Sequence, residues 1–414
     1  MNINEIGCYK NILLLQGPRG GFFSHLGRHL TSRGCAVYKV NFNGGDELFY
    51  PLPNTLPFRG KFSEWELFLA RTLNEKEIKA ICLFGDCRSY HQVAIRLSQH
   101  LGIAIYVFEE GYIRPDYITF EKYGVNGRSQ IPCSPAFYKS LPEPGDKQPL
   151  PARSSFRRMA VSASAYQIFE FLMRWRYPSY QCHKNFSLQK EAFFWVRAGL
   201  RKSVYRFKER GLLEAVSGPL RKKYFLVPLQ VYNDSQVVVH SKYRSVEAFI
   251  AEVIQSFAKH AEPDHFLILK HHPFDRGHTD YTRFIESTSE KYHVRERIKY
   301  VHDVHLPTLL RNALGAVVIN STVGMSSLHH NTPVKVMGTA VYDIAGLTHQ
   351  RNLDTFWRDH KGIDRKLYRR FRDYIIQYTQ INGSFYGLSP FETQADRSYY
   401  PTRSEEYAKS GQTT

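Results

Sequence analysis

Short apolar runs alternate with amphipathic segments along most of the chain. In the first half, runs of strand length occupy residues 12–15, 36–42, 80–84 and 103–108, and segments with helical periodicity separate them. Strands that alternate with helices predict a parallel, doubly wound α/β sheet. Each run ends in glycine or polar residues, so the strand ends should line one common cleft.

The same alternation returns in the second half of the chain. Strands are predicted at residues 225–231, 266–270, 298–301, 316–319 and 334–337. A helical region at 354–377 could pack back across both halves. Two Rossmann-like halves with a returning C-terminal helix predict an α/β protein of GT-B-like architecture, in which two Rossmann-type domains face a cleft.

Prolines cluster between residues 132 and 151, where the alternation stops, and they mark a domain boundary or linker. A chain of 414 residues exceeds the size at which one core keeps growing, which favours two domains. The predicted divisions are an N-terminal Rossmann-like domain at 1–145, a basic aromatic helical insert or linker at 146–222, a C-terminal Rossmann-like domain at 223–350, return helices at 351–390 and a tail at 391–414.

Charge changes the picture of the insert. The chain carries a net charge of +18, and residues 151–223 hold sixteen Lys and Arg against four Asp and Glu. Such a concentration implies an anionic partner. The aromatic content of the segment suits helices lying on an anionic membrane surface, but equally a helical insert packed on the sheet with a solvated basic face. Because no recognised nucleic-acid motif accompanies the charge, we expect no nucleic-acid partner.

The six cysteines, at positions 8, 35, 82, 87, 133 and 182, form no C-x-x-C pair and no zinc spacing, and we interpret them as reduced thiols. The sequence shows no ligand cluster that requires a metal. No signal peptide is visible, and no run of 18 apolar residues could span a bilayer. These features predict a cytoplasmic protein.

Asp234 is the first candidate for chemistry, because it follows the strand at 225–231 without an intervening turn residue. Open α/β sheets place ligands beyond the carboxyl ends of their strands, and Gln230 lies in the same polar stretch. The alternative is structural, since an aspartate at this position could cap a helix that starts near Gln236.

Two further strand ends in the second half suggest a phosphate site. His272 follows a strand, and Pro273 fixes the backbone so that the imidazole points into the cleft, where it can hydrogen-bond or, when protonated, pair with a phosphate. Asn320, Ser321 and Thr322 lie at a strand-to-helix turn with free amides and two hydroxyls. Each feature alone is commonly structural, but together they favour a phosphate-bearing donor.

Glu109 and Glu110 supply the complementary part from the first half, because a following glycine allows a tight turn that places at least one carboxylate in the cleft. The partner across the cleft would be Asp234. Two carboxylates that face a sugar, one as acid/base and one as nucleophile, are the machinery of retaining glycosyl transfer. The alternative is that the glutamates pair with Arg88 or Arg114 in an ordinary surface cluster.

Eight motifs resemble those of the capsule polysaccharide proteins called KpsS or LipB. They are Leu-Gln-Gly-Pro18, Phe42-Asn-Gly-Gly-Asp46, Phe84-Gly-Asp-Cys-Arg88, Phe108-Glu-Glu-Gly-Tyr112, Leu229-Gln-Val-Tyr-Asn-Asp-Ser-Gln236, Lys270-His-His-Pro273, Asp275-Arg-Gly-His278 and Ile319-Asn-Ser-Thr322. The resemblance spans about Ile12 to Tyr386. It implies a retaining β-Kdo glycosyltransferase that moves the first β-Kdo from CMP-β-Kdo to phosphatidylglycerol or lysophosphatidylglycerol, beginning the poly-Kdo linker of capsular polysaccharide.

The resemblance also implies roles for individual residues. Asp234, in a Gln-x-x-x-Asp motif, would be the covalent nucleophile, and we favour Glu110 over Glu109 as acid/base because it adjoins the glycine. The C-terminal domain would bind the CMP-sugar through Gln230, Lys270, His272, Pro273, Asn320, Ser321 and Thr322. The N-terminal domain would provide the acceptor side of the cleft, including Gly17, Arg19 and Arg114. No metal or cofactor is expected beside the donor.

The implied partners are an anionic lipid acceptor, the inner face of the cytoplasmic membrane, to which the protein would bind peripherally, and a capsule biosynthesis or export complex. A different class of function remains open at this point. A non-catalytic, membrane-associated adaptor in capsule export would bind liposomes but would not bind CMP.

Overall fold

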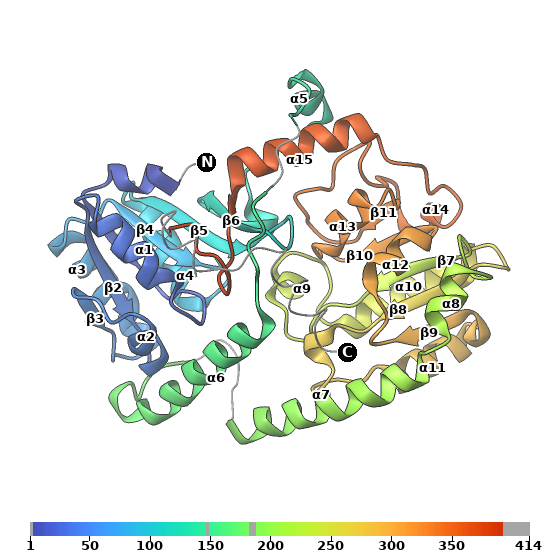
Figure 1. The fold of residues 1–414 in the computed structure, drawn as a ribbon, viewed down its shortest axis with the longest axis horizontal. Helices are drawn as coiled ribbons and strands as arrows, with labels where there is room; N and C mark the ends of the chain where they lie inside the picture. The colour runs from blue at the N-terminus through green and yellow to red at the C-terminus, as the bar shows by residue number, and fades with distance from the viewer. Residues whose placement is uncertain (1–2, 146–148, 182–187, 392–414) are drawn as a thin grey trace, which may run out of the picture.

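The computed structural model describes residues 3–145, 149–181 and 188–391, and side chains are not described at 188–192 and 235. The chain forms two α/β lobes that lie side by side (Figure 1), one around a seven-stranded sheet and the other around a five-stranded sheet. The predicted tail lies outside the described residues from position 392 onward, as does Cys182. Two Rossmann-like lobes confirm the predicted α/β fold class of GT-B-like type.

The amino-terminal lobe is built on a sheet with the strand order β12-β6-β5-β4-β1-β2-β3. Its strands are β1 (Asn11–Leu14), β2 (Ala36–Asn41), β3 (Thr55–Pro57), β4 (Ala80–Phe84), β5 (Ala104–Glu110), β6 (Tyr117–Lys122) and β12 (Gln380–Asn382). Five neighbouring strands of this sheet are parallel, as predicted; in sheet order they are β3, β2, β1, β4 and β5. The far edge is different, because β6 runs antiparallel to β5 and β12 runs antiparallel to β6.

A glycine explains why β5 turns back into β6. A Cβ atom at Gly111 would lie 2.1 Å from the carbonyl oxygen of Tyr117, so only glycine allows the two strands to approach at this turn. The turn also contains the cis peptide bond between Arg114 and Pro115. The hairpin therefore holds the carboxyl end of β5, where Glu109 and Glu110 lie.

Helices cover both faces of the amino-terminal sheet, and they are α1 (Phe22–Thr31), α2 (Gly44–Phe49), α3 (Trp65–Glu75) and α4 (Ser89–His100). Helix α5 (Pro135–Ser140) instead packs against the C-terminal helix α15 (Arg365–Thr379). One core gathers Phe22, Phe108 and Phe120 on one face of the sheet. The other core gathers apolar residues around Trp65 and Leu83. Residues of one core alternate along each strand with residues of the other, because successive side chains of a strand point to opposite faces of the sheet.

The carboxy-terminal lobe has an entirely parallel sheet with the order β11-β10-β7-β8-β9. Its strands are β7 (Tyr224–Pro228), β8 (Phe266–Lys270), β9 (Ile298–Val301), β10 (Gly315–Val318) and β11 (Val334–Val336). Its helices are α9 (Ser235–Val239), α10 (Val246–His260), α11 (Thr282–Lys291), α12 (Leu306–Asn312), α13 (Val323–His329) and α14 (Leu353–Phe356). All five residues of β7 are buried, as expected for a central parallel strand with helices on both faces.

Helix α15 (Arg365–Thr379) connects the two lobes. Its apolar face packs into the carboxy-terminal lobe through Phe371 and Ile375, and the chain then crosses to form β12 on the edge of the amino-terminal sheet (Figure 1). Helix α15 confirms that the C-terminal region returns across both halves.

The basic segment divides between the lobes. Helix α6 (Phe156–Leu172) packs against α2 of the amino-terminal lobe, where a Cβ atom at Gly44 would lie 2.3 Å from the carbonyl oxygen of Phe169. Helix α7 (Leu188–Lys208) packs against the carboxy-terminal lobe, where a Cβ at Gly277 would lie 2.2 Å from the carbonyl oxygen of Phe194. Helix α8 (Leu212–Ser217) follows. Among the described helices, none has the length and apolar character that crossing a bilayer requires.

Candidate active site

Asp234 lies between the lobes at the start of α9, which occupies the middle of the molecule in Figure 1. Its Oδ1 accepts a hydrogen bond of 2.9 Å from the backbone N–H of Gln236, so it is the N-cap of the helix. Its Oδ2 accepts a bond of 3.2 Å from the side-chain amide of Gln230. The structural alternative is therefore confirmed, but it leaves room for chemistry, because the capped carboxylate is only partly buried and is held in one orientation.

Asn320 connects the end of β10 to the same helix. Its Nδ2 donates to the carbonyl oxygens of Gln236 and His240, at 2.8 and 3.3 Å, and its backbone N–H donates to Oε1 of Gln230 at 3.4 Å. Asn320 therefore holds both ends of α9, and Gln230 connects it to Asp234. Its Nδ2 is engaged in this structural role, whereas its buried Oδ1 has no hydrogen-bond partner among the described residues.

Ser321 and Thr322 follow at the turn into α13. The hydroxyl of Ser321 accepts a hydrogen bond of 3.2 Å from the backbone N–H of Val323, and both Ser321 and Thr322 are partly exposed. The sequence placed these hydroxyls in the cleft, and their partial exposure is compatible with contact to a ligand.

His272 presents a neutral imidazole. Its Nδ1 accepts a hydrogen bond of 3.2 Å from the backbone N–H of Phe274, so the proton of the neutral ring lies on Nε2. Burial lowers the pKa of His272 to about 4; the Asp234 carboxylate opposes this shift, and the charges of Lys270 and Arg114 add to it. At neutral pH the ring is therefore a hydrogen-bond donor through Nε2–H, rather than the protonated partner that the sequence also allowed.

Lys270 does not turn toward His272. Its Nζ is buried and donates a hydrogen bond of 3.0 Å to the carbonyl oxygen of His302 at the end of β9. Burial lowers the pKa of Lys270 to about 8. Its expected part in neutralising a phosphate is therefore limited in this structure to the effect of its charge.

The two glutamates of β5 occupy different environments. Burial raises the pKa of Glu109 to about 7, although the backbone N–H of Glu110 donates to its Oε1 at 3.0 Å and opposes the shift. Glu110 is exposed, and its backbone carbonyl accepts a hydrogen bond of 3.0 Å from the hydroxyl of Thr119. The two side chains point to opposite faces of the strand, so they serve different surroundings.

The surface-cluster alternative for these glutamates is met only in part, because the charge of Arg88 acts on Glu109 and lowers its pKa. Arg88 donates to Oε1 of Gln16 and to the carbonyl oxygen of Gly17, at 2.9 and 3.3 Å, and Arg114 donates to the carbonyl oxygen of Gly111 at 3.2 Å. Among the ion pairs of the described residues, neither arginine is paired with either glutamate. The carboxylates therefore remain available at the strand end.

Arg114 faces the other lobe, because its charge contributes to the lowered pKa of His272. Gly17, in contrast, is buried, and a Cβ atom there would lie 2.9 Å from the ring of Phe23. The glycine serves the tight turn after β1 and touches the cleft only through its carbonyl bond to Arg88. Arg19, two residues further, reaches out over the ring of Tyr166 at 5.7 Å.

A cavity of about 690 Å³ lies beside these residues, between α6 and α7. Apolar side chains from both helices form its walls, and its lining includes Phe156, Met159, Ala163, Phe194, Trp195, Ala198, Phe274 and Tyr386. Arg19 and Lys202 bring positive charge to it, whereas Arg276, also in the lining, is paired with the Asp303 carboxylate at 2.9 Å. The loop at Val231 to Asn233, which leads directly to Asp234, forms one side, and Pro273, next to His272, forms another.

Tyr386 connects Glu110 to this cavity. Burial raises the pKa of the Tyr386 phenol to about 12, and the charge of Glu110 adds to the shift while that of Arg19 opposes it. Glu110 and Arg19 therefore lie close to a residue of the cavity wall. Sequence reasoning missed Tyr386 and Phe274, because both lie outside the basic aromatic segment at 146–222 and no local pattern marks them as part of a pocket.

Comparison with known proteins gives a consistent result. The family model described as "Capsule polysaccharide biosynthesis protein" matches residues 79–386. The capsule polysaccharide export protein KpsS of Escherichia coli is 42% identical over 381 residues, which cover 91% of this chain and 97% of that protein. The capsule polysaccharide modification protein LipB of Neisseria meningitidis serogroup A is 41% identical over 390 residues, covering 92% and 93%.

Solved structures resemble the chain more distantly. The beta Kdo 2,7 transferase of Thermosulfurimonas dismutans KpsC aligns with a TM-score of 0.37 and 16% identity, covering 78% of this chain and 83% of that one. A glycosyltransferase from Rickettsia africae aligns with a TM-score of 0.38 and 11% identity, covering 98% and 99%.

Proposed function

The chain belongs to the family of capsule polysaccharide biosynthesis proteins, and from this premise we propose that it is a retaining β-Kdo glycosyltransferase of capsule linker synthesis. It would transfer the first β-Kdo from CMP-β-Kdo to phosphatidylglycerol or lysophosphatidylglycerol. The observation that carries the proposal is the Asp234 carboxylate, which Gln230 and the α9 cap hold in one orientation beside a neutral His272.

The carboxy-terminal lobe would bind the donor. The Nε2–H of His272 is free to donate to a phosphate oxygen, because Nδ1 is already engaged by the backbone. Arg114 of the opposite lobe supplies a positive charge near His272, suited to the phosphate or to the sugar carboxylate. The partly exposed hydroxyls of Ser321 and Thr322 would complete this side.

The reaction would proceed in two displacements. Asp234 Oδ2 attacks the anomeric carbon, the bond to the CMP oxygen breaks, and CMP leaves with the electron pair, giving a covalent glycosyl–aspartate. Kdo carries a carboxylate on its anomeric carbon, and this favours splitting the step in this way. Glu110 then takes the proton of the acceptor hydroxyl, whose oxygen displaces Asp234. Two inversions give retention.

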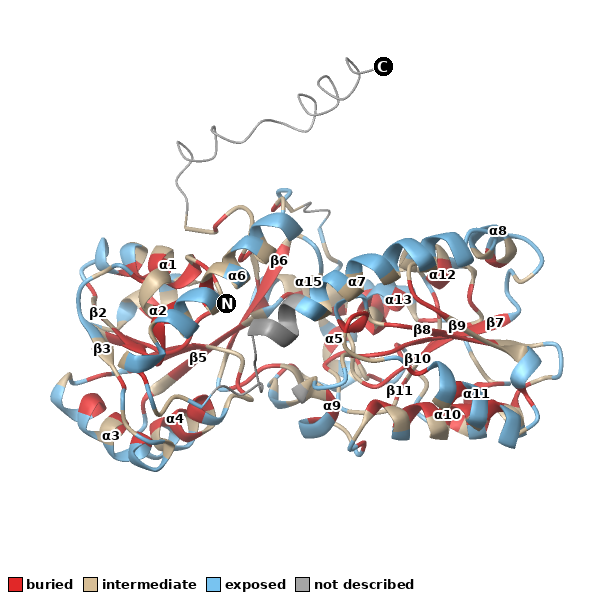
Figure 2. Ribbon diagram, turned by 90° about the horizontal axis from the view of Figure 1, so that it is seen from below, coloured by how far each residue is buried: buried red, intermediate tan, exposed pale blue. Residues whose placement is uncertain are grey.

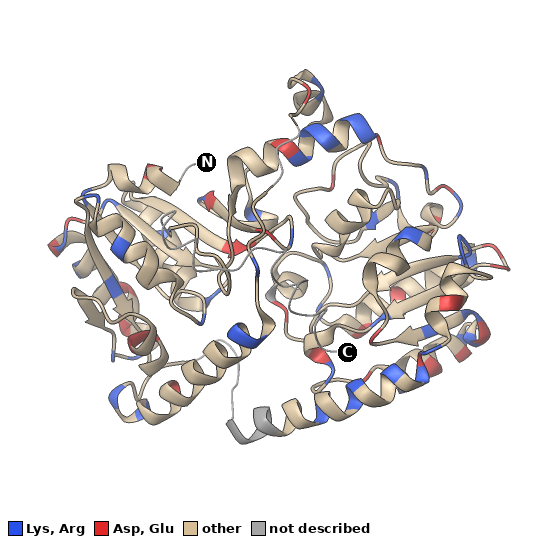
Figure 3. Ribbon diagram, viewed as in Figure 1, with Lys and Arg blue, Asp and Glu red and all other residues tan. Residues whose placement is uncertain are grey.

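The cavity between α6 and α7 would receive the lipid acceptor. Its apolar walls suit an acyl or glycerol portion, and Arg19 and Lys202 suit an anionic headgroup. Exposed residues recur along both helices (Figure 2). The exposed apolar side chains on the two helices, and in the turn after α6, include Phe171, Trp175, Phe193, Leu200 and Phe207. Lys and Arg lie along α7 beside them (Figure 3), the combination that binds an anionic leaflet. We therefore propose peripheral attachment through this face.

The test is incubation of the purified protein with CMP-β-Kdo and a short-chain phosphatidylglycerol, followed by mass spectrometry of the lipid. We expect a product heavier by one Kdo. Asp234→Asn is the matched variant, because asparagine also caps helices and should preserve α9. It should lower the rate by at least about 10³-fold, as expected when a covalent nucleophile is lost. Wild-type activity in this variant would show that Asp234 is not the nucleophile. If calorimetry detected no CMP binding by the wild-type protein, the adaptor function would be favoured.

A further inference from the structure

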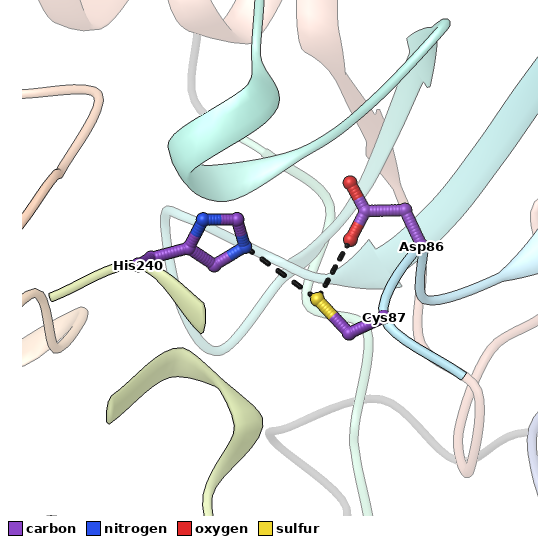
Figure 4. Close-up of side chains that lie close together, drawn as sticks. All are labelled: Asp86, Cys87 and His240. Carbon is purple, nitrogen blue, oxygen red and sulfur yellow. Dashed lines mark hydrogen bonds between the residues drawn. The ribbon is translucent and has the colours of Figure 1, made fainter. Parts of the chain in front are cut away.

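Three side chains that are far apart in the sequence meet between the lobes (Figure 4). Asp86 and Cys87 directly follow β4 in the amino-terminal lobe, and His240 ends α9 in the carboxy-terminal lobe, 153 positions from Cys87. The Sγ of Cys87 lies 3.1 Å from Oδ1 of Asp86 and 3.5 Å from Nε2 of His240. All three atoms lie within 4.8 Å of one another.

Asp86 and His240 are buried, Cys87 is partly buried, and surrounding contacts hold the cluster. Asp86 and His240 are only 1% and 7% exposed. The backbone N–H of Val125 donates to Oδ2 of Asp86 at 3.2 Å, which leaves Oδ1 directed at Cys87. A Cβ atom at Gly127 would lie 2.4 Å from Nδ1 of His240, so the glycine makes room for the ring. The three donor atoms therefore converge from positions that the fold itself fixes.

We propose that Asp86, Cys87 and His240 form an interlobe site for Zn²⁺ or a similar thiophilic divalent cation. Sulfur, imidazole nitrogen and carboxylate oxygen are the donors that Zn²⁺ prefers. With metal–ligand distances of about 2.3 Å to sulfur and about 2.0 Å to nitrogen, tetrahedral coordination places sulfur and nitrogen roughly 3.5 Å apart. The observed separation of Cys87 and His240 agrees with this geometry. Water would occupy the fourth position.

Binding would exchange a proton for the metal. The thiol of Cys87 loses its proton to solvent as the Sγ–metal bond forms, and Nε2 of His240 contributes its lone pair. The thiolate and the Asp86 carboxylate together balance the two positive charges of the ion. Arg128 is the competitor, since its Nη1 lies 3.6 Å from Oδ1 of Asp86, but the same atom donates a hydrogen bond of 3.1 Å to the backbone carbonyl oxygen of Asp86, which does not involve the carboxylate.

The site lies between the two lobes, so a bound metal would affect how they are held together. Two ligands belong to one lobe and the third to the other, so a bound ion joins the lobes directly. His240 closes the helix that Asp234 opens, and Asn320 contacts both helix ends. A metal at His240 would therefore fix α9 against β4 and restrict the separation of the lobes. Residues so distant in sequence show no metal spacing, which explains why the sequence indicated no such cluster.

Cobalt titration of the full-length, chelator-treated and reduced protein tests the proposal. We expect one Co²⁺ per chain, with the intense absorption of thiolate-to-cobalt charge transfer, and displacement of Co²⁺ by Zn²⁺. Cys87→Ser should abolish the charge-transfer band, and His240→Ala should weaken binding at least about tenfold. Cys133→Ser removes an exposed cysteine outside the cluster and should leave the titration unchanged.

Thermal unfolding supplies an independent readout. One equivalent of Zn²⁺ should raise the Tm of the wild-type protein and of Cys133→Ser, but not that of Cys87→Ser. If His240→Ala does not fold, His240→Gln keeps a polar side chain of similar size for the same titration. Absence of the band in the wild-type protein, or a band that survives Cys87→Ser, overturns the site.

Discussion

The two sides of the candidate site are built on different principles. On the carboxy-terminal side, a chain of hydrogen bonds runs from the backbone N–H of Asn320 to the side chain of Gln230 and from there to the Asp234 carboxylate. On the side of α6 and α7, the cavity is lined mainly by aromatic and aliphatic groups, and Arg19 and Lys202 add charge to them. The difference suits two kinds of substrate. A charged nucleotide sugar needs preorganised polar groups, whereas a lipid needs apolar surface that adapts to its shape.

The largest effect is expected from variants of the two glutamates, which lie where the polar side and the apolar side of the site meet. Glu110→Gln should lower the transfer rate by about 10²- to 10⁴-fold, because the acceptor hydroxyl loses its general base. Glu109→Gln is the matched variant, and its effect at pH 7 should be less than about tenfold, since the side chain lies on the other face of β5. Initial rates at saturating donor check both. A larger loss of transfer rate in Glu109→Gln than in Glu110→Gln would show that Glu109, not Glu110, is the general base.

The polar side should respond strongly to loss of a single donor. His272→Ala should weaken CMP binding by about 10- to 100-fold, the range for a hydrogen bond to a charged group. Because burial keeps the pKa of His272 low, at about 4, the affinity should not rise as the pH falls from 7 to 6, a range that lies below the pKa of about 8 of Lys270. Calorimetric titration with CMP at the two pH values measures both effects. A marked gain in affinity at pH 6 would indicate a protonated ring.

The apolar side should respond to loss of exposed aromatic surface. Trp175 is 77% exposed beside α6, and Trp175→Ala should weaken binding to phosphatidylglycerol vesicles by roughly tenfold, the value of burying one large apolar side chain. CMP binding should not change. Leu101→Ala, at an exposed position after α4, is the control for a general loss of surface hydrophobicity. Equal effects of the two variants in vesicle sedimentation would argue against attachment through this face.

The smallest effect concerns stability. The pKa of Glu109 is raised to about 7, above its ordinary value of 4.5, so the folded state favours the protonated acid. The contribution of this group to stability is full below pH 4.5 and is lost as the pH rises through 7. Glu109→Gln, which mimics the protonated form, should therefore raise the Tm by about 2 °C at pH 8 and leave it unchanged at pH 4.5. Scanning calorimetry at both pH values checks this difference.

The sequence predicted those parts of the fold that carry a local signal. The strands expected at 80–84 and 266–270 coincide with β4 and β8, because 80–84 is apolar throughout and 266–269 is an apolar run that ends at Lys270. Strand β12 has only three residues, too few to show a period, and its pairing with β6 depends on the fold of the whole chain. The antiparallel return of β6 depends on a single glycine contact that composition does not reveal.

The site shows the same division. Positions after strands are visible in the sequence, so Asp234, His272 and the glutamates could be proposed from it. The protonation states of these side chains could not be predicted from the sequence. The low pKa of His272 and the high pKa of Glu109 result from burial by residues that are distant in the chain. Lys270 was expected to face a phosphate, but its bond to the His302 carbonyl turns it away. The cavity between α6 and α7 requires both helices to be placed, which no periodicity determines.

The edge strand β12 also constrains how the molecule is made. The side chain of Gln380 donates to the hydroxyl of Thr119, 261 positions earlier, and lies in the register that closes the amino-terminal sheet. During translation the edge of β6 remains unpaired until almost the whole polypeptide has left the ribosome, because β12 is synthesised late. The first lobe to be synthesised is thus among the last to be completed, and a chain that stops before residue 380 would carry an unpaired β6 open to association with other copies.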